Sequence, residues 1–458
     1  MASQAREHWG SKIGFVLAAA GSAIGLGNIW KFPYVTGENG GAAFVLIYLV
    51  CVLILGMPIM IAELVIGRHT EKDPVGAFKS IAGGTRWEIV GYLGVLSGFF
   101  ILSFYGVVGG WTLGYIVKSF SGAINNIEDM KSAELIFNNF VHSPGTMIFY
   151  QFIFMGACMF IVYRGINNGI ERWSKVLMPL LFVILLVLIV RGISMEGGME
   201  GVSFFLKPDF SKITTSSVLA ALGQSFFSLS LGMGAMITYG SYLSRKERIL
   251  QSGIYIVILD TLIAILAGLA IFPSVFAMNM SPSEGPGLIY HVIPAAFGNM
   301  PYGQFFSILF FILLFIAALT SGISLLEVVV AYITDEKQWS RKKAVYIFGG
   351  IIFLLGIPSA LSFSVMGDVK IFGNIFFDFM DKLTSNYMLP IGGFFIAIFL
   401  GWKYGLEKTI HELDPDTKII SLKELWAFMI KFVSPFILLI VFIMTVKDDI
   451  IGFFSSLF

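Results

Sequence analysis

Long apolar segments recur along this chain and constrain its fold more than any other feature. A helix of roughly 20 apolar residues crosses a bilayer, and by that criterion the chain contains about eleven spans. Only 13% of its 458 residues are charged, whereas about 25% are charged in a typical soluble domain. Because hydrocarbon offers no partner to backbone polar groups, segments of this length must be helical. The sequence therefore predicts an all-α integral membrane protein. The expected spans cover residues 11–35, 41–67, 87–119, 147–163, 170–192, 217–243, 250–277, 302–333, 343–362, 372–402 and 424–446.

Positive charges orient these spans. The Lys and Arg residues outside the spans concentrate on one side of the membrane, and cytoplasmic loops carry such an excess. Arg6 and Lys12 precede the first apolar segment in the manner of a signal peptide. Removing that segment, however, would reverse the fit of every later loop to the charge pattern, so we interpret it as a span. We expect a multi-pass protein of the cell membrane, with a cytoplasmic N-terminus and an extracellular C-terminus.

Two apolar segments are interrupted by glycine. The stretch from Ala18 to Tyr34, AAAGSAIGLGNIWKFPY, contains three closely spaced glycines followed by Asn28. A second stretch, SLSLGMG from Ser228 to Gly234, lies far downstream. A glycine inside a helix costs about 1 kcal/mol relative to alanine, and broken helices persist in membranes where the released backbone groups find partners. A pair of such breaks indicates the substrate and ion site of a transporter. The alternative is that these glycines only let helices pack closely.

Few residues offer chemistry of another kind. Cys51 and Cys158 both lie in apolar segments and are interpreted as buried thiols, without a disulfide or metal framework. The five histidines fall in loops or near span ends, and no metal-ligand or nucleophile constellation is present. A net charge of +1 gives no indication of a nucleic-acid partner. The pattern does not favour an enzyme.

Several motifs together resemble a known family. They are the first glycine break, REHWGSKIGF at 6–15, ENGG at 38–41, GINNGIER at 165–172 and GQSFFSLSLG at 223–232. Along essentially the whole chain they resemble the neurotransmitter:sodium symporter family, in particular its bacterial, leucine-transporter-like amino-acid transporters. The resemblance implies a single transmembrane transporter domain over 1–458, with helices 1 and 6 broken. It further implies a first five-helix repeat at 11–192, an inverted second repeat at 217–402 and an additional helix at 424–446.

The resemblance implies two sodium sites, and sodium prefers oxygen ligands of the kind that broken backbone, hydroxyl and amide groups supply. The first site would use Ala23, Asn28, Ser228 and Asp260. The second would use Gly21, Ile24, Ala317, Thr320 and Ser321. Taken without the resemblance, Thr320 and Ser321 are also explained by hydroxyls bonded to their own helix.

Asp260 departs from the family pattern. Many relatives carry Asn at this position, and chloride-dependent members carry a serine one turn later, where this chain has Ala264. A carboxylate inside an apolar span is expensive and is a functional candidate by default. We expect it to supply the negative charge that chloride provides in those relatives. The alternative is an Asp that serves helix packing only.

Gly25 defines the expected substrate. Amine transporters of the family carry an Asp there, so its absence favours a ligand with a carboxylate, which backbone N–H groups at a helix break attract. Tyr105 is the expected side-chain donor to that carboxylate. By resemblance the remaining pocket is mostly apolar, which favours hydrophobic or aromatic amino acids. The implied substrate-binding residues are Ala23, Gly25, Leu26, Gly27, Ile101, Tyr105, Phe227, Ser228, Ser230, Met233, Ser321 and Leu325.

Charged pairs are expected as gates on both sides of the site. Outside, Lys31 would face Asp381, although Lys lacks the bidentate fork of the Arg that the family more often has. Inside, the resemblance implies a pair between Arg6 and Asp335, close to Trp9 and Tyr242.

Pro179 would weaken the fifth span on its cytoplasmic side, because proline leaves the carbonyl of Lys175 without its helical donor. A static kink explains the same residue equally well.

These expectations describe a sodium symporter that imports hydrophobic or aromatic L-amino acids by alternating access, without chloride. Its partners would be an amino-acid substrate, Na⁺ at two sites and membrane lipid, with no nucleic acid and no obligatory protein partner. A proton-coupled transporter of the same fold, in which Asp260 titrates, remains the alternative. An ion channel is less favoured, because ion sites tied to a substrate carboxylate suit stoichiometric coupling.

Overall fold

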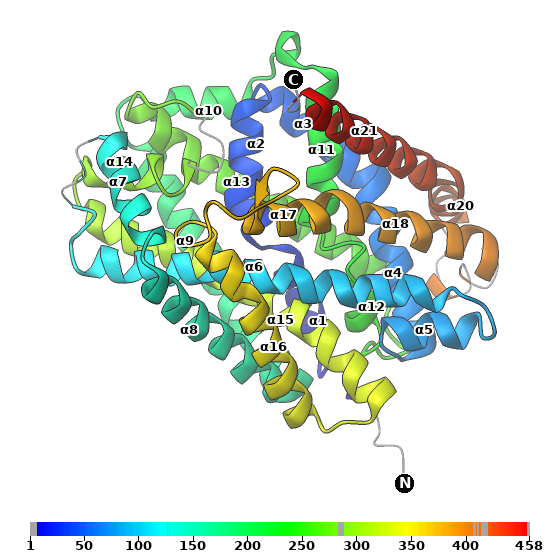
Figure 1. The fold of residues 1–458 in the computed structure, drawn as a ribbon. Coiled ribbons are helices and arrows are strands. Elements are labelled where there is room, and N and C mark those ends of the chain that lie inside the picture. Colours follow the sequence, from blue (N-terminus) through cyan, green and yellow to red (C-terminus); the bar gives the residue numbers. More distant parts are fainter. Residues whose placement is uncertain are drawn as a thin grey trace.

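The computed structural model describes residues 7–125, 127, 129–282, 288–405, 409, 412–413 and 420–455. These residues form a bundle of helices, as the sequence predicts (Figure 1). The two short strands β1 (Lys370–Ile371) and β2 (Asn374–Ile375) pair antiparallel in the loop before the tenth span. The prediction of an all-α membrane fold is confirmed.

Unbroken helices form five of the expected spans. They are α6 (Glu88–Phe120), α8 (Pro144–Tyr163), α13 (Ile249–Ala277), α15 (Gly303–Lys337) and α16 (Arg341–Leu361). Four further spans contain a wider π-helical turn. They are α3 (Ala42–Cys51), η2 (Val52–Gly56) and α4 (Met57–Thr70); η3 (Ile166–Glu171) and α9 (Arg172–Ile193); α17 (Phe376–Asp381), η6 (Lys382–Met388), α18 (Leu389–Ile398) and η7 (Phe399–Tyr404); and α20 (Ile420–Phe428), η8 (Met429–Val433) and α21 (Ser434–Ser455).

The two remaining spans are interrupted at the predicted places. The first consists of α1 (Lys12–Ala23), η1 (Gly27–Lys31) and α2 (Phe32–Glu38), with a 51° bend at the break. The sixth consists of α11 (Thr215–Ser228) and α12 (Ala235–Gly240). Within the described residues, nine helices pass a length and hydropathy test for spanning, and the bent first span makes ten. The sixth span falls outside that test because its two pieces are 14 and 6 residues long.

Short helices fill the connections between spans. They are α5 (Pro74–Ile81), α7 (Met130–Val141), α10 (Gly198–Leu206), η4 (Phe210–Lys212) and α14 (Val292–Gly298). Their starts follow ordinary capping rules: the Asp73 carboxylate accepts from the backbone N–H groups of Val75 and Gly76 at the start of α5.

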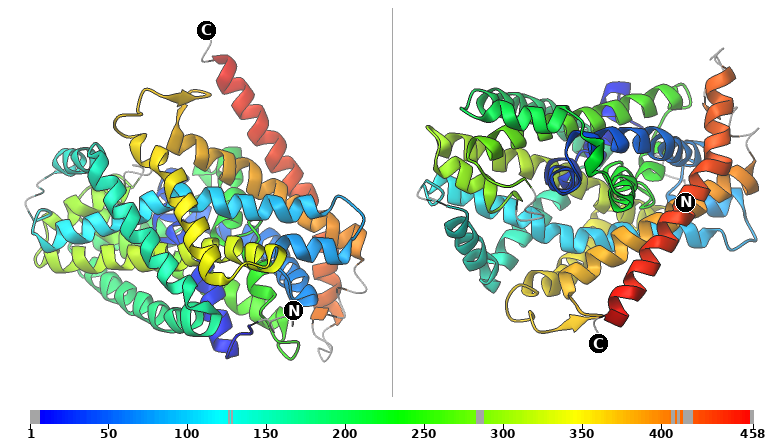
Figure 2. Two further views of the ribbon diagram at one scale, coloured as in Figure 1. Left: turned by 60° about the horizontal axis from the view of Figure 1, so that its bottom comes forward. Right: turned by 90° about the horizontal axis from the view of Figure 1, so that it is seen from above.

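The broken first span lies inside the bundle, and the C-terminal helix lies along its outside (Figure 2). In the most apolar stretch of α6 and of α15, 78% is buried inside the protein. In the span that contains α21 the buried share is 28%. Helix α1 packs against α9, α13 and α15. This arrangement surrounds the first break with protein, which lets its released backbone groups find polar partners. The assignment of residues 11–192 and 217–402 to inverted repeats stays a prediction.

Candidate functional site

Gly25 lies at the break in the first span, where another residue would not fit. Helix α1 ends at Ala23, and Ile24 leaves the helical conformation with φ −72° and ψ 89°. A Cβ atom on Gly25 would lie 2.4 Å from the Ser321 hydroxyl oxygen. The released N–H groups find side-chain partners: Gly25 donates to Asn28 Oδ1 (3.3 Å) and Leu26 to the Tyr105 hydroxyl (3.3 Å). The glycine therefore gives Ser321 and Tyr105 access to bare backbone.

The second break rests on left-handed backbone. Ser230, Gly232 and Gly234 have φ of 54°, 78° and 74°, a conformation that suits glycine and is strained for serine. Gly232 donates its N–H to Oε1 of Glu63 (2.7 Å), a fully buried carboxylate on α4. This support was not predicted, although Glu63 is the one acidic residue within the expected span 41–67.

Asn28, Ser228 and Asp260 form a buried polar cluster between the two breaks. The Asn28 amide nitrogen donates to Asp260 Oδ1 (2.8 Å) and to the Ser228 hydroxyl (3.0 Å). Ser228 in turn donates to Asp260 Oδ2 (2.9 Å), and all three residues are fully buried. Tyr48 adds a hydrogen bond to Ser228 (3.2 Å). The structure thus brings together the three side chains predicted for the first sodium site, from α11, α13 and the first span.

The residues predicted for the second sodium site lie where α1 faces α15. A Cβ atom on Gly21 would lie 3.4 Å from Thr320 Cβ. The Thr320 hydroxyl donates within its own helix, to the carbonyls of Ile316 and Ala317 (both 3.1 Å). Ser321 instead donates across to the Ser22 carbonyl of α1 (3.0 Å). The Thr320 hydroxyl therefore bonds within its own helix, whereas the Ser321 hydroxyl links α15 to α1.

A small cavity of about 30 Å³ lies at the meeting point of the two breaks. Its lining includes every predicted substrate-binding residue except Ser228, which belongs to the polar cluster just described. Ser22 and Ser324 also line it and were missed, although Ser22 lies within the first break. The Ser22 carbonyl accepts from both Ser230 (2.9 Å) and Ser321 (3.0 Å). A cavity of this size holds about one or two waters, so a larger ligand requires these side chains to move.

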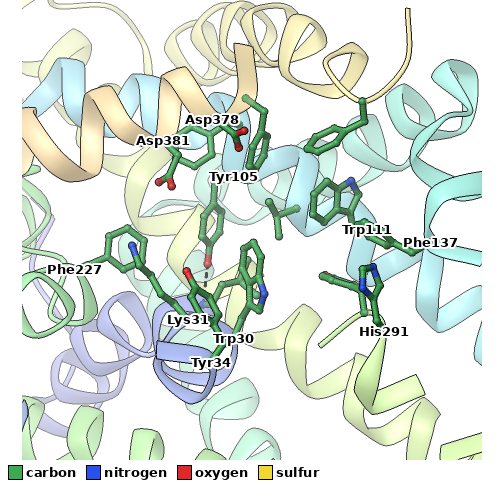
Figure 3. Close-up of a pocket in the computed structure, with 16 residues that line it drawn as sticks. Trp30, Lys31, Tyr34, Tyr105, Trp111, Phe137, Phe227, His291, Asp378 and Asp381 are labelled. Atoms are coloured by element: carbon green, nitrogen blue, oxygen red, sulfur yellow. Dashed lines mark hydrogen bonds between the residues drawn. The ribbon is translucent and has the colours of Figure 1, made fainter. Parts of the chain in front are cut away.

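A larger pocket of about 300 Å³ adjoins the cavity and shares Leu26, Tyr105 and Phe227 with it (Figure 3). Trp30, Trp111 and other aromatic rings line it. Lys31 and Asp381 both border it, as predicted for an outer gate, together with Asp378, which was not predicted. Among the described residues Lys31 forms no ion pair with Asp381. Its ammonium lies 4.5 Å from the centre of the Phe227 ring, and Asp381 accepts from the Ser385 hydroxyl (2.7 Å).

The opposite end of the site is closed by buried polar contacts. Trp9 donates from its indole nitrogen to the Tyr239 carbonyl (3.0 Å), and its ring packs edge-on against Tyr242, with 6.1 Å between centroids. The Tyr242 hydroxyl donates to Glu327 (2.7 Å), which is ion-paired with Arg341. The Glu327–Arg341 pair was not predicted, although Glu327 is the one acidic residue within the expected span 302–333.

The predicted inner gate is described in part. Arg6 lies outside the described residues, and Asp335 accepts from the backbone N–H of Asp73 (3.0 Å) at the start of α5. Burial, followed by the charges of Asp335 and Glu336, raises the pKa of Asp73 to about 7.

Another buried carboxylate, Glu171, holds the segment just before and at the start of α1. It accepts from the Gly10 N–H (2.7 Å), the Ser11 hydroxyl (2.9 Å) and the Lys175 ammonium (2.6 Å). A Cβ atom on Gly14 would lie 2.1 Å from Glu171 Oε1, so this close approach requires glycine. Helix α9 is continuous through Pro179, so the weakening of this span by the proline stays a prediction.

A bundle of spanning helices with two broken members, whose breaks meet at a buried polar cluster, is the architecture of a secondary transporter. The chain belongs to the sodium:neurotransmitter symporter family, whose model matches residues 6–128 and 125–451. This agrees with the family that the sequence motifs indicate.

Relatives match along nearly the full length. A sodium-dependent transporter of Bacillus subtilis, YhdH, is 41% identical over 97% of this chain and 98% of its own. A sodium-dependent transporter of Haemophilus influenzae is 38% identical over 96% and 98%. The crystal structure of MhsT in complex with L-phenylalanine superposes with a TM-score of 0.89 at 46% identity, covering 96% of this chain and all of that one. The protein is therefore a sodium-dependent, multi-pass membrane symporter and not an enzyme.

Proposed function

We propose that this symporter imports hydrophobic or aromatic L-amino acids, coupled to sodium and independent of chloride. The observation that carries the proposal is the cavity at the two helix breaks. Bare backbone at Gly25 and the Tyr105 hydroxyl line it, together with four serines and the apolar side chains of Ile101, Met233 and Leu325.

The polar side of the cavity suits a carboxylate. The N–H of Leu26 donates to the Tyr105 hydroxyl in this structure, and both residues line the cavity, where an incoming carboxylate would replace this bond. The position of Gly25 leaves no room for an acidic side chain, which would repel that anion. The binding of L-phenylalanine by MhsT, a protein of 46% identity, supports an amino acid as the substrate.

Sodium coupling is attributed to the cluster of Asn28, Ser228 and Asp260. An Asn28 amide turned by 180° would present Oδ1 beside the oxygens of Ser228 and Asp260, a set that suits a hard cation. The Asp260 charge supplies the negative partner. Ala264, one turn later, has no hydroxyl to hold chloride. The substrate carboxylate would complete the first sodium site, which links substrate and ion affinities.

Transport would proceed by alternating exposure of this cluster. Access from outside passes the aromatic pocket lined by Tyr105 and Phe227. Access from inside requires the contacts of Trp9, Glu171 and Glu327 to open. A second sodium between α1 and α15, at Gly21, Ile24, Ala317, Thr320 and Ser321, would tie the two helices together and favour the inward-closed state.

Uptake into proteoliposomes tests the proposal. A sodium gradient should drive accumulation of phenylalanine, leucine and tryptophan, and replacing chloride with gluconate should leave the rate unchanged. A pH gradient without sodium should drive none. Uptake driven by protons alone would favour the proton-coupled alternative, and a large loss in gluconate would refute chloride independence. Tyramine, which lacks the carboxylate, should not compete.

Met233 offers a test of substrate size. Its flexible thioether lies in the cavity wall between two glycines of the second break. Met233→Phe adds a rigid ring, so tryptophan affinity should fall about tenfold or more, a loss of roughly 1–3 kcal/mol, while leucine changes little. Equal weakening of both substrates would show that Met233 only supports the break.

A further inference from the structure

A groove of about 590 Å³ runs between α8 and α16 on the outer face of the bundle, away from the transport site. The two helices lie side by side in Figure 1 and are packed against each other. Only 39% of the most apolar stretch of each helix is buried within the protein. The groove therefore faces the lipid.

Two glycines make the groove. A Cβ atom on Gly156 of α8 or on Gly350 of α16 would meet nothing within 4 Å. The neighbouring Gly349 differs, because its Cβ would lie 2.8 Å from the Met159 sulfur. Gly349 thus allows close helix packing, the usual reason for small residues in membrane helices. Gly156 and Gly350 make no such close contact, and their missing side chains leave the groove open between the helices.

Aromatic pairs lie at the two ends of this groove. Phe152 and Phe353 lie 5.7 Å apart at one end, and Tyr163 and Tyr346 lie 6.0 Å apart at the other. From residue 152 to residue 163 a helix rises about 16 Å, roughly half of the ~30 Å hydrocarbon thickness. The groove therefore matches the depth of one leaflet, and tyrosine at its end is typical of the membrane interface.

The tyrosine end carries positive charge. Arg164 is the only charged side chain among the described residues that line the groove, and its guanidinium lies 4.2 Å from the centre of the Phe160 ring. Lys342 and Lys343 precede Tyr346 by about one helical turn at the start of α16. The charge pattern of the loops assigns this end to the cytoplasm. Arg is well suited to bind a phosphate group through its planar fork.

We propose that this groove is a binding site for one anionic phospholipid. An acyl chain lies over Gly156 and Gly350, and the headgroup phosphate contacts Arg164. The one-leaflet depth and the single cationic end favour a lipid over a second copy of the chain.

Native mass spectrometry of the purified protein tests the site. The protein is equilibrated with mixed micelles of phosphatidylglycerol and phosphatidylcholine that carry the same acyl chains. We expect one retained phosphatidylglycerol, preferred about tenfold. Gly156→Leu fills the groove and should reduce retention at least tenfold, as should Gly350→Leu. Gly145→Leu is the matched control: it lies on the same helix, its Cβ also meets nothing within 4 Å, and it is outside the groove.

Leucine is a far better helix former than glycine, so these variants should unfold at the wild-type temperature or above. If Gly156→Leu unfolds, Gly350→Leu decides the test. Arg164→Gln keeps the groove and should make the two lipids equal. Equal retention of both lipids by the wild type would overturn the proposal, as would equal retention by the Gly156→Leu and Gly145→Leu variants. A wild-type dimer without bound phospholipid that Gly156→Leu dissociates would overturn it in favour of contact between copies.

Discussion

The two sides of the central polar cluster are closed by different kinds of contact. On the side of the aromatic pocket, Lys31 rests on the Phe227 ring at 4.5 Å, and Asp381 bonds to Ser385. On the other side, Glu327 and Arg341 form a buried ion pair, which Tyr242 joins. Ring contacts between half-exposed groups are readily exchanged for water, whereas a buried charge deprived of its partner is costly. The inner side should therefore be the stronger closure in this state.

Removing one partner of the inner ion pair should have the largest effect. Glu327→Gln leaves the partly buried Arg341, whose side chain is 22% exposed, without a counter-charge. The free energy of unfolding should therefore fall by up to about 3 kcal/mol, the lower end of the range for a fully buried pair. Denaturant unfolding of the purified protein measures this loss. The double variant Glu327→Gln/Arg341→Met should recover most of it, because both charges are then gone. If the double variant is as unstable as the single one, the ion pair is not the cause.

The next largest effect is expected in the pH dependence of the free energy of unfolding, which depends on Asp73 beside the predicted inner gate. The pKa of Asp73 is raised to about 7, while an unfolded Asp titrates at about 3.9. Between these values the unfolded chain loses its proton and the folded protein keeps it, so stability falls as pH rises and levels off above pH 7.

Asp73→Asn removes this titration and should still cap α5. From pH 5 to pH 8 it should gain about 1–3 kcal/mol relative to the wild type. Unfolding at the two pH values measures the gain, and the exposed Glu134→Gln serves as the control. An identical difference between variant and wild type at both pH values would contradict the expectation.

The N-terminal contact should loosen without global unfolding. Glu171→Gln weakens the charge-assisted bonds to Gly10, Ser11 and Lys175. Hydrogen exchange of the amides of residues 9–14 should accelerate about tenfold, since such bonds contribute about 1.5–3 kcal/mol. Glu200→Gln, on the exposed surface of α10, should leave those amides unchanged. Equal protection in Glu171→Gln would mean that Trp9 alone holds the segment.

The outer pair should show the smallest effect. Because Lys31 and Asp381 form no ion pair in this state, Asp381→Asn should change the free energy of unfolding by less than about 1 kcal/mol. The same denaturant experiment compares it with Glu327→Gln. Losses of equal size would remove the difference between the two sides. The guanidinium of Lys31→Arg can form two hydrogen bonds to the Asp381 carboxylate. This variant should therefore slow substrate dissociation if the gate closes during transport.

The spans and their breaks were predictable from the sequence, because hydropathy and glycine influence the backbone only locally, within a few residues. The expected span 87–119 agrees with α6 (Glu88–Phe120), and the break predicted in the first span agrees with the bend after Ala23. An apolar stretch long enough to cross the bilayer must be helical wherever it lies in the chain, and a glycine weakens that helix at its own position.

The partners of the released groups were decided by tertiary structure. The Ser22 carbonyl accepts from Ser321, almost three hundred residues later, and Gly232 donates to Glu63. The family resemblance indicated which residues surround the site, and the packing decided which atoms satisfy one another. A hydrogen bond depends on the distance and direction of two groups. For residues this far apart in sequence, only the packed helices set that geometry.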